Sequence, residues 1–257
     1  MIGLLIKTLN PDLIKNHTKT VILIWTLCIF GPISGIMFGL FLIMGSYTMI
    51  DFGLSARDAL LIDAFLSIIY FLQHSIVVRR GFKQRLGNIM PNVYHNAFYG
   101  LTSIITLILV LVFWQKIPAV IARVDGIIFW LICVSFCLCL AGFLWGALSL
   151  GSFDALGVKP LMLYISNIQE RPQPIVAKGP YRWVRHPLYL FLIVIIWSYP
   201  VLTLDRLLFN IMWSIWIVIG TYLEDRNLRR EFGSQYSAYS SQVPMLIPYR
   251  LLKNKSV

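Results

Sequence analysis

Long apolar runs are the feature that most limits how this chain can fold. Six stretches are predominantly hydrophobic. Their lengths are near the number of residues that a helix needs to cross a bilayer core, which is about 20. They cover residues 21–47, 59–78, 97–114, 126–150, 188–204 and 207–223. Only 13% of all residues are charged, whereas soluble domains average about 25%. The sequence therefore predicts an all-α fold, a polytopic integral membrane helical bundle of about six transmembrane helices.

The distribution of Lys and Arg predicts how these helices are oriented. Most of these residues lie in the N-terminus, the loops at 79–95 and 171–185, and the tail, and few lie at 48–58, 115–125 and 205–206. Because cytoplasmic loops are enriched in Lys and Arg, we expect both termini in the cytoplasm. The last two spans are joined only by Asp205-Arg206, which predicts an antiparallel hairpin. This alternation would bring His74, Arg185 and Glu224 to the cytoplasmic face.

The charge and the positions of the cysteines limit the kinds of molecule or metal that the chain is expected to bind. The net charge of +11 resides in short loops between apolar spans, a pattern that indicates attraction to membrane lipids and no nucleic-acid partner. The four cysteines lie inside apolar runs, without zinc-site spacing, so we expect no metal. No protein partner can be inferred. With no internal repeat, we expect a single transmembrane domain, 1–257, comprising an N-terminal four-helix part (1–150) and a second part (151–257).

The first polar block whose side chains could bind a ligand or take part in a reaction lies between two apolar runs. It reads Lys178-Gly179-Pro180-Tyr181-Arg182-Trp183-Val184-Arg185-His186-Pro187-Leu188-Tyr189. Pro187 suits the first turn of a helix, so Arg185 and His186 would precede a helix N-terminus, where free N–H groups favour an anion. Aromatic side chains nearby could stack on a flat ring. The alternative is a basic loop whose cations reach lipid headgroups.

A second polar block follows one predicted hairpin later. Glu224, Leu228 and Glu231 share one helix face, with Asp225 beside it, and Phe232-Gly233 resembles a helix end. A carboxylate directly after a span could hold a cationic group or a ribose hydroxyl. An ordinary charged helix end is the alternative.

The two blocks together resemble a known family pattern. The matching residues are Gly179-Pro180-Tyr181-x-x-Val184-Arg185-His186-Pro187-x-Tyr189, Glu224-Asp225-x-x-Leu228-x-x-x-Phe232-Gly233-x-x-Tyr236-x-x-Tyr239 and Val243-Pro244-x-Leu246-Ile247-Pro248. This pattern resembles the isoprenylcysteine carboxyl methyltransferase and phospholipid methyltransferase superfamily of membrane enzymes. Asp225 stands where the family usually has a second glutamate, and Phe191 replaces a commonly small residue, which would narrow the pocket.

The N-terminal half resembles one branch of that superfamily. Its motifs are Leu72-Gln73-His74-Ser75-x-x-x-Arg79-x-x-Phe82-Lys83, Phe113-Trp114-Gln115 and Ser152-Phe153-Asp154-x-Leu156-Gly157. They are similar to the methanethiol S-methyltransferase and NnrU-like branch. Tyr94-His95-Asn96 departs from the charged residues that the branch tends to carry at the start of the third span.

The resemblance implies a methyltransferase that uses S-adenosyl-L-methionine at the cytoplasmic face. It implies Arg185, Glu224 and His74 as catalytic residues. The donor-binding residues it implies are Gly179, Tyr181, Arg185, His186, Pro187, Tyr189, Glu224, Asp225 and Leu228. The acceptor would be small and apolar, such as methanethiol, or lipid-linked, such as an isoprenylcysteine carboxylate or a phospholipid amine. A packing role for His74 and a non-enzymatic NnrU-like transport or assembly protein are the alternatives.

Overall fold

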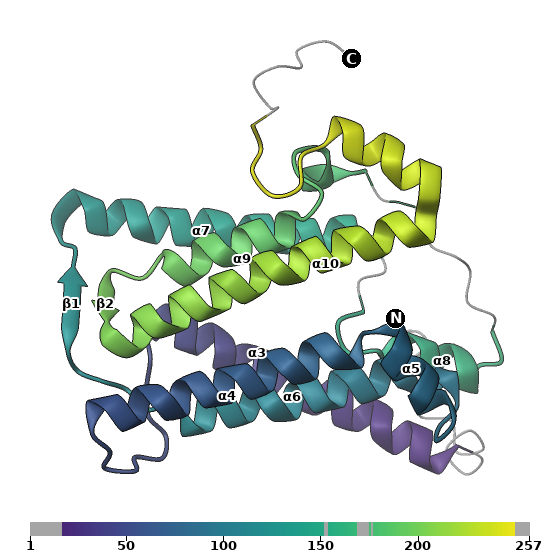
Figure 1. The fold of residues 1–257 in the computed structure, drawn as a ribbon, viewed down its shortest axis with the longest axis horizontal. Coiled ribbons are helices and arrows are strands. Elements are labelled where there is room, and N and C mark those ends of the chain that lie inside the picture. The colour runs from purple at the N-terminus through teal and green to yellow at the C-terminus, as the bar shows by residue number, and fades with distance from the viewer. Residues whose placement is uncertain (1–16, 152–153, 169–174, 176, 250–257) are drawn as a thin grey trace. The chain divides into compact units, whose positions relative to one another are not determined.

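The computed structural model describes residues 17–151, 154–168, 175 and 177–249. The elements in chain order are α3 (Thr18–Met44), α4 (Ala56–Val77), α5 (Arg80–Gly87), η1 (Asn92–Tyr94), α6 (His95–Phe113), β1 (Val120–Arg123), α7 (Gly126–Ser149), α8 (Val158–Ile165), η2 (Gly179–Arg182), α9 (Pro187–Trp197), β2 (Val201–Thr203) and α10 (Leu204–Gln242). Figure 1 shows these elements. They form two compact units, one of residues 1–115 and 154–172 and the other of residues 116–153 and 173–257.

Five helices, α3, α4, α6, α7 and α10, are long and apolar enough to cross a membrane. This confirms the predicted all-α polytopic membrane fold. The predicted span at 188–204 is shorter than expected, because α9 has only 11 residues and is followed by β2. At 1.5 Å per residue α9 measures about 16 Å, roughly half the thickness of a bilayer core. The orientation of the termini and the single-domain organisation stay predictions.

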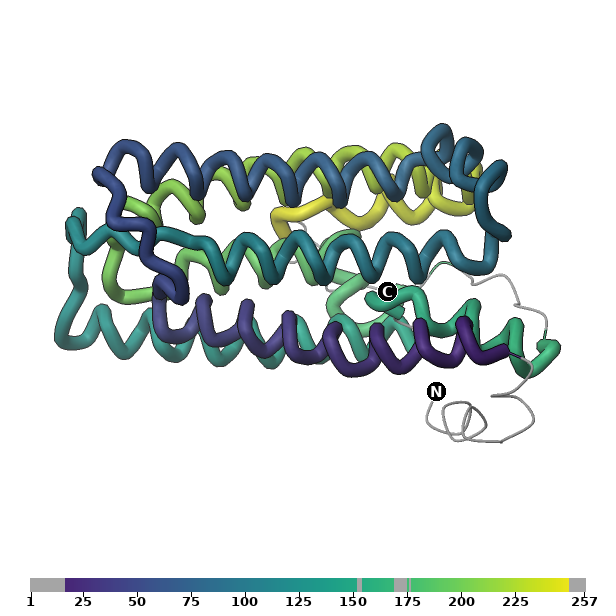
Figure 2. The backbone as a smooth tube through the Cα atoms, turned by 90° about the horizontal axis from the view of Figure 1, so that it is seen from below, coloured from purple at the N-terminus to yellow at the C-terminus, as the bar shows by residue number. Residues whose placement is uncertain are grey.

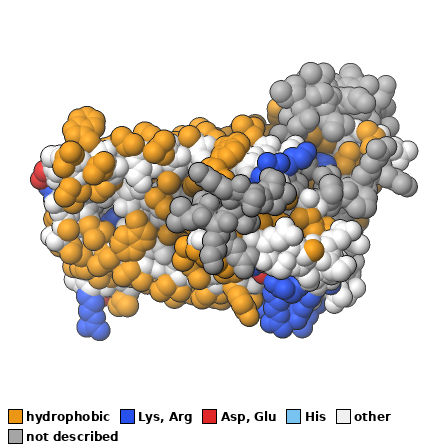
Figure 3. All heavy atoms as spheres, turned by 90° about the horizontal axis from the view of Figure 1, so that it is seen from above, with side chains coloured by type: hydrophobic (Ala, Val, Ile, Leu, Met, Phe, Trp, Pro, Cys, Tyr) orange, Lys and Arg blue, Asp and Glu red, His pale blue; other side chains and the backbone are white. Residues whose placement is uncertain are grey.

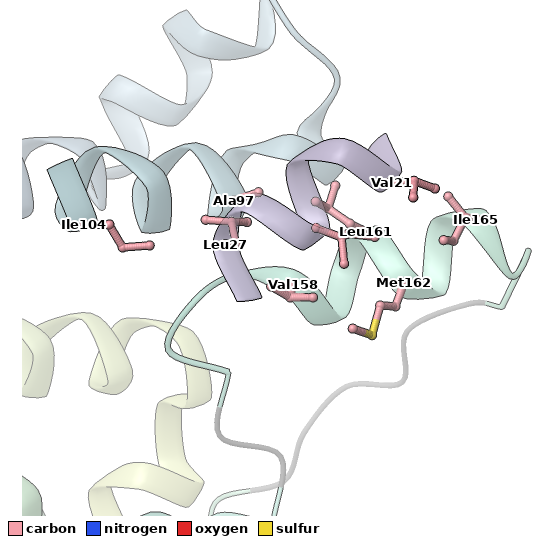
Figure 4. Packing of buried hydrophobic residues seen from close by; sticks show 9 residues of the cluster. Val21, Leu27, Ala97, Ile104, Val158, Leu161, Met162 and Ile165 are labelled. Atoms are coloured by element: carbon pink, nitrogen blue, oxygen red, sulfur yellow. The ribbon is translucent and has the colours of Figure 1, made fainter. Parts of the chain in front are cut away.

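The first unit packs three long helices side by side. Helix α6 contacts both α3 and α4, and Figure 2 shows it running between them. The short helix α8 completes the core, where Val21, Leu27, Ala97, Leu161 and Met162 are almost fully buried (Figure 4). This apolar cluster lies at the N-terminal ends of α3 and α6.

The Asp154-x-Leu156-Gly157 part of the motif that begins at Ser152 has a structural role in this unit. The Asp154 carboxylate accepts hydrogen bonds from the backbone N–H groups of Val158 (3.1 Å) and Lys159 (2.8 Å), which begin α8. Gly157 has φ +69°, and a Cβ there would lie 2.2 Å from the backbone of Asn96. Only glycine fits so tight an approach with a positive φ. Ser152 and Phe153 of that motif lie outside the described residues.

The second unit joins α7, α9 and α10 with the two short strands. Helix α9 packs against α7 and α10, and Figure 1 shows the three running alongside one another. Strands β1 and β2 pair antiparallel, with Val120 opposite Thr203 and Arg123 opposite Val201. The ring of Phe191 fills the space beside Gly142 of α7, where a Cβ would approach it to 2.7 Å. Phe191 therefore packs α9 against α7, and the narrowing of the pocket by its ring stays a prediction.

The prediction that Asp205 and Arg206 form a connecting loop is wrong. Both lie in the first turn of α10 and are fully buried. The Arg206 guanidinium donates to the carbonyl of Ile196 (3.3 Å) and lies 5.2 Å from the ring centre of Tyr199. Residues 198–203 make the connection instead. The acidic Asp205 lies near the positive end of the helix dipole, where a carboxylate is favourable.

The described surface fits a membrane setting. Large apolar side chains on α7 are widely exposed, including Ile127 (77%) and Leu148 (80%). In Figure 3 hydrophobic side chains cover much of the visible helical surface, whereas Lys and Arg gather in a few small groups. Such exposure would favour aggregation in water and is expected where lipid surrounds the helices.

Candidate functional site

The first polar block folds into a tight turn against the end of α7. Gly179 has φ +55°, and a Cβ there would lie 2.3 Å from Oγ of Ser149. The turn continues as η2 and buries Pro180 and Tyr181. Trp183 packs edge-to-face on Trp145, with ring centres 5.0 Å apart. The turn thus fixes the backbone that leads into Arg185 and His186.

Arg185 connects the first polar block to the C-terminal part of α10. Its Nε donates to Oδ1 of Asp225 at 2.8 Å. Its Nη1 donates to the carbonyl oxygens of Ser240 (3.0 Å) and Val243 (2.7 Å). Among the described residues, none accepts a hydrogen bond from Nη2. One guanidinium nitrogen is therefore free for an anionic ligand while the other two are held by the protein.

Asp225 is the centre of this network. Besides Arg185, its Oδ1 accepts from the hydroxyl of Tyr236 (2.6 Å) and contacts Nε2 of His186 (3.4 Å). Arg229 approaches Oδ2 at 3.5 Å from the solvent side, where its own side chain is half exposed. The Asp225 side chain is only 11% exposed. Its partners in the structure are thus protein groups that hold the two polar blocks together.

Glu224 precedes Asp225 in the chain but contacts different side chains. Its Oε2 accepts a hydrogen bond from the hydroxyl of Tyr189 at 2.6 Å. Among the described residues, none donates to Oε1. The ring of Tyr189 stacks on His186, with centres 5.8 Å apart and planes at 24°. Glu224 and Tyr189 therefore offer a carboxylate oxygen beside an aromatic face.

The chain after Gly233 folds back over the first polar block. Gly233 interrupts α10 with φ +55° and ψ −122°, as the predicted helix end requires, and a helical segment then continues to Gln242. The backbone N–H groups of Arg185 and His186 donate to the carbonyls of Pro244 (2.9 Å) and Met245 (3.1 Å). The hydroxyl of Tyr239 donates to the carbonyl of Tyr181 (2.6 Å). Figure 1 shows this turned segment at the end of α10.

Burial sets the protonation of the two titratable groups in the turn. It lowers the pKa of His186, although Glu224 and Asp225 oppose that shift, so the ring is neutral near pH 7. A neutral His186 can still donate its N–H to Asp225. Burial, with help from Glu224 and Tyr239, raises the pKa of Tyr181 well above its ordinary value. The Tyr181 hydroxyl therefore keeps its proton.

The structure brings most of the predicted site residues together in the second unit. Arg185, His186, Tyr189, Glu224 and Asp225 form one connected set. Gly179, Tyr181 and Pro187 shape the backbone beside it, and Leu228 lies half-buried one turn after Glu224. Sequence reasoning gave no role to the two tyrosines after Gly233. Only their place in the family pattern pointed to them.

His74 belongs to the first unit, where it joins α4 to α6. Its ring contacts the hydroxyl of Tyr99 and lies 5.4 Å from the ring of Tyr70. The neighbouring Gln73 bonds to Thr102 (2.7 Å) on α6. The catalytic assignment of His74 stays a prediction.

Comparison with known proteins identifies relatives over most of the chain. A methanethiol S-methyltransferase from Crocosphaera subtropica is 33% identical over 196 residues, which is 76% of this chain and 77% of that protein. One from a Pseudomonas species is 32% identical over 214 residues, covering 77% and 76% of the two chains. Nurim from Xenopus laevis is 22% identical over 218 residues, covering 75% and 72%. No protein-family model and no solved structure matches the chain.

Proposed function

The chain belongs to the methanethiol S-methyltransferase family, and from this membership we propose that it methylates a small thiol such as methanethiol to dimethyl sulfide. We infer that the methyl donor is S-adenosyl-L-methionine. The site in the second unit, at the cytoplasmic face of the membrane, would bind the donor.

Two atoms of the charged groups carry the donor assignment. Nη2 of Arg185 and Oε1 of Glu224 make no hydrogen bond with the described residues. A guanidinium nitrogen suits the carboxylate of the donor's amino-acid end. A carboxylate oxygen suits its ammonium group or a ribose hydroxyl. The residues present therefore fit a ligand that has both kinds of group.

The remaining residues would shape this pocket. Tyr181 and Tyr189 supply aromatic faces, and such a face near a sulfonium gains a cation–π attraction. His186 and Pro187 form the entry to α9, and Gly179 lets the loop lie close to α7. Leu228 would cover an apolar part of the donor. Asp225 would act through Arg185, which it holds in place.

Bound S-adenosyl-L-methionine supplies an activated methyl group on a sulfonium. The chain then has to align the acceptor in line with that methyl and to exclude water, and proximity alone accounts for a large part of such rate enhancements. Arg185 and Glu224 would fix the two ends of the donor. The Arg185 bonds to Ser240 and Val243 keep the C-terminal segment over the first polar block, where it would limit the entry of water.

An acceptor for an intramembrane enzyme must reach it through the bilayer or be anchored there. Methanethiol is small and apolar enough for the first route, and the relatives known as methanethiol S-methyltransferases favour it. An isoprenylcysteine carboxylate or a phospholipid amine would use the second route. These acceptors, and a non-enzymatic membrane role, are the outcomes from which an experiment must separate the thiol.

The test is calorimetric binding of S-adenosylhomocysteine to purified protein in detergent, followed by transfer of labelled methyl groups to methanethiol. Micromolar binding and a volatile labelled product are expected. Binding without that product would replace the thiol by a lipid-linked acceptor. Absence of binding in folded protein would overturn the methyltransferase assignment and favour the non-enzymatic role.

A further inference from the structure

Helix α5 and the residue before it carry the densest positive charge of the first unit. Arg79 is the N-cap residue of this helix, and Arg80, Lys83 and Arg85 lie within it. Figure 1 shows α5 at the end of α4. No Asp or Glu occurs between residues 64 and 124, so no acidic residue near in sequence balances these four cations. We refer to residues 79–85 as the basic segment.

The folded protein also leaves this charge uncompensated. Arg79, Arg80 and Arg85 are exposed, and no ion pair of the described residues includes any of them. The Lys83 ammonium donates to the amide oxygen of Asn96 at 3.3 Å, which is a neutral partner. The cations of the basic segment are therefore available to an anion outside the protein.

Apolar side chains anchor α5 on the rest of the first unit. Leu86 is buried, and the ring of Phe82 stacks on Phe98 of α6, with centres 6.5 Å apart and planes at 21°. Further contacts join α5 to α4 and η1. Because the helix is packed in place, the cations form a fixed array. Binding an anion then orders less of the chain than it would in a flexible loop.

The length of α4 places the basic segment at the depth of the lipid headgroups. This helix has 22 residues, and at 1.5 Å per residue it measures about 33 Å, enough to cross a bilayer core. It ends at Val77, two residues before Arg79. Apolar side chains flank the cations, since Val78 is 48% and Ile89 81% exposed. Cations beside exposed apolar groups at the end of a span are typical of a segment that contacts both headgroups and acyl chains.

Orientation of the chain during membrane insertion is the competing explanation of the basic segment. That role depends on the number of Lys and Arg residues near the end of a span. It requires neither their attachment to a packed helix nor exposed apolar side chains beside them. The packing of Phe82 and Leu86 therefore favours a surface that acts in the folded protein.

We propose that the basic segment binds the headgroups of anionic phospholipids in the surrounding membrane. Guanidinium groups suit a phosphate because two of their N–H groups can donate to two of its oxygens. The three exposed arginines would contact the headgroups, and Val78 and Ile89 would contact the acyl chains. The proposal does not depend on the reaction that the protein catalyses.

The test is native mass spectrometry of the full-length protein in detergent, titrated with phosphatidylglycerol or with phosphatidylcholine of the same acyl chains. The wild-type protein should bind the anionic lipid more tightly. One Lys or Arg near anionic lipid strengthens binding about fivefold, so Arg80→Gln should weaken phosphatidylglycerol binding about fivefold. The double variant Arg79→Gln and Arg80→Gln should weaken it about 25-fold. Phosphatidylcholine binding should not change, and Arg80→Lys, which keeps the charge, should recover most of the loss.

Arg57→Gln is the matched control, because it removes one exposed arginine from the opposite end of α4. It should bind phosphatidylglycerol as the wild type does. Equal affinities of the wild type for both lipids, or equal losses in Arg57→Gln and Arg80→Gln, would overturn the proposal. Parallel loss of both lipids in Arg80→Gln would indicate a structural role and contradict it as well. Displacement of phosphatidylglycerol by an equal concentration of inorganic phosphate would replace the lipid by a soluble anion.

Discussion

Two regions of the molecule, one in each unit, place polar groups among apolar helices in different ways. Between α4 and α6 of the first unit, the amide of Gln73 forms hydrogen bonds with the hydroxyls of Thr102, Ser103 and Thr106. All of these groups are neutral and lie inside the spans. The second unit concentrates charge, since Arg185, Asp225 and Glu224 gather where α9 begins and the apolar part of α10 ends.

The difference follows from the cost of charge in hydrocarbon. A neutral hydrogen bond between membrane helices contributes only about 0.6 kcal/mol on average, whereas a charged side chain at the bilayer centre costs several kcal/mol. Neutral contacts can therefore hold spans together at any depth. Paired charges are costly to bury and are expected where they organise a site. The stability of the second unit should therefore be far more sensitive to single substitutions in its charged network.

The largest expected effect is that of Asp225→Asn. It removes the charge that faces Arg185, whose side chain is 9% exposed, and breaking such a buried pair costs about 3–5 kcal/mol. Unfolding in detergent should show a correspondingly lower midpoint. Asp225→Glu keeps the charge and should recover most of the loss. A wild-type midpoint for Asp225→Asn would remove Asp225 from the centre of the network.

Glu224→Gln separates ligand binding from folding. The amide oxygen can still accept from Tyr189, so stability should change little, but the charge for a cationic ligand is lost. A charge-assisted hydrogen bond contributes about 1.5–3 kcal/mol, so S-adenosylhomocysteine should bind about 10- to 100-fold more weakly by calorimetry. The exposed Glu231→Gln on the same helix is the control and should bind normally. Equal affinities would exclude Glu224 from the donor site.

Gln73→Leu tests the neutral side of the comparison. It removes the interhelical bonds of the first unit, and the expected loss of stability is about 1 kcal/mol and at most about 1.7 kcal/mol. Donor binding should not change. A loss as large as that of Asp225→Asn, measured under the same unfolding conditions, would show that neutral and charged networks do not differ as we infer.

The pH dependence of stability tests the charged network of the second unit through His186. Because burial lowers the pKa of His186, the unfolded chain binds more protons than the folded protein just below the ordinary value of about 6.5. The contribution of His186 to the free energy of unfolding is therefore fully present above that pH. It falls as the pH drops through 6.5, by at most about 1.4 kcal/mol per pH unit. Unfolding midpoints between pH 7.5 and 5.5 check this. The same series on His186→Gln should lack that contribution.

Local sequence signals predicted much of this structure. Apolar runs located the five long helices but gave too long a helix at 188–204, and Gly233 marked the break in α10. The residues of the donor site came from the family pattern. That pattern could not reveal that Asp225 bonds to Tyr236 across this break, since only the folded chain brings them together.

Other features depended on long-range pairing that leaves little trace in sequence. The two paired strands, Val120–Arg123 and Val201–Thr203, are too short to predict from sequence. Helix α9 ends at Trp197, and β2 lies in the connection that precedes Asp205 and Arg206. Charged residues between two apolar runs usually indicate a loop. Here Arg206 is buried because the Ile196 carbonyl and the Tyr199 ring accommodate it.

The return of the chain after Gly233 has a consequence for how the protein is made. Arg185 is synthesised 55 and 58 residues before the carbonyls of Ser240 and Val243 that accept its hydrogen bonds. A nascent chain that has reached Gly233 already contains every residue assigned to the donor site. It nevertheless lacks the segment that holds Arg185 in place, so donor-binding competence should arise only after translation has passed Met245.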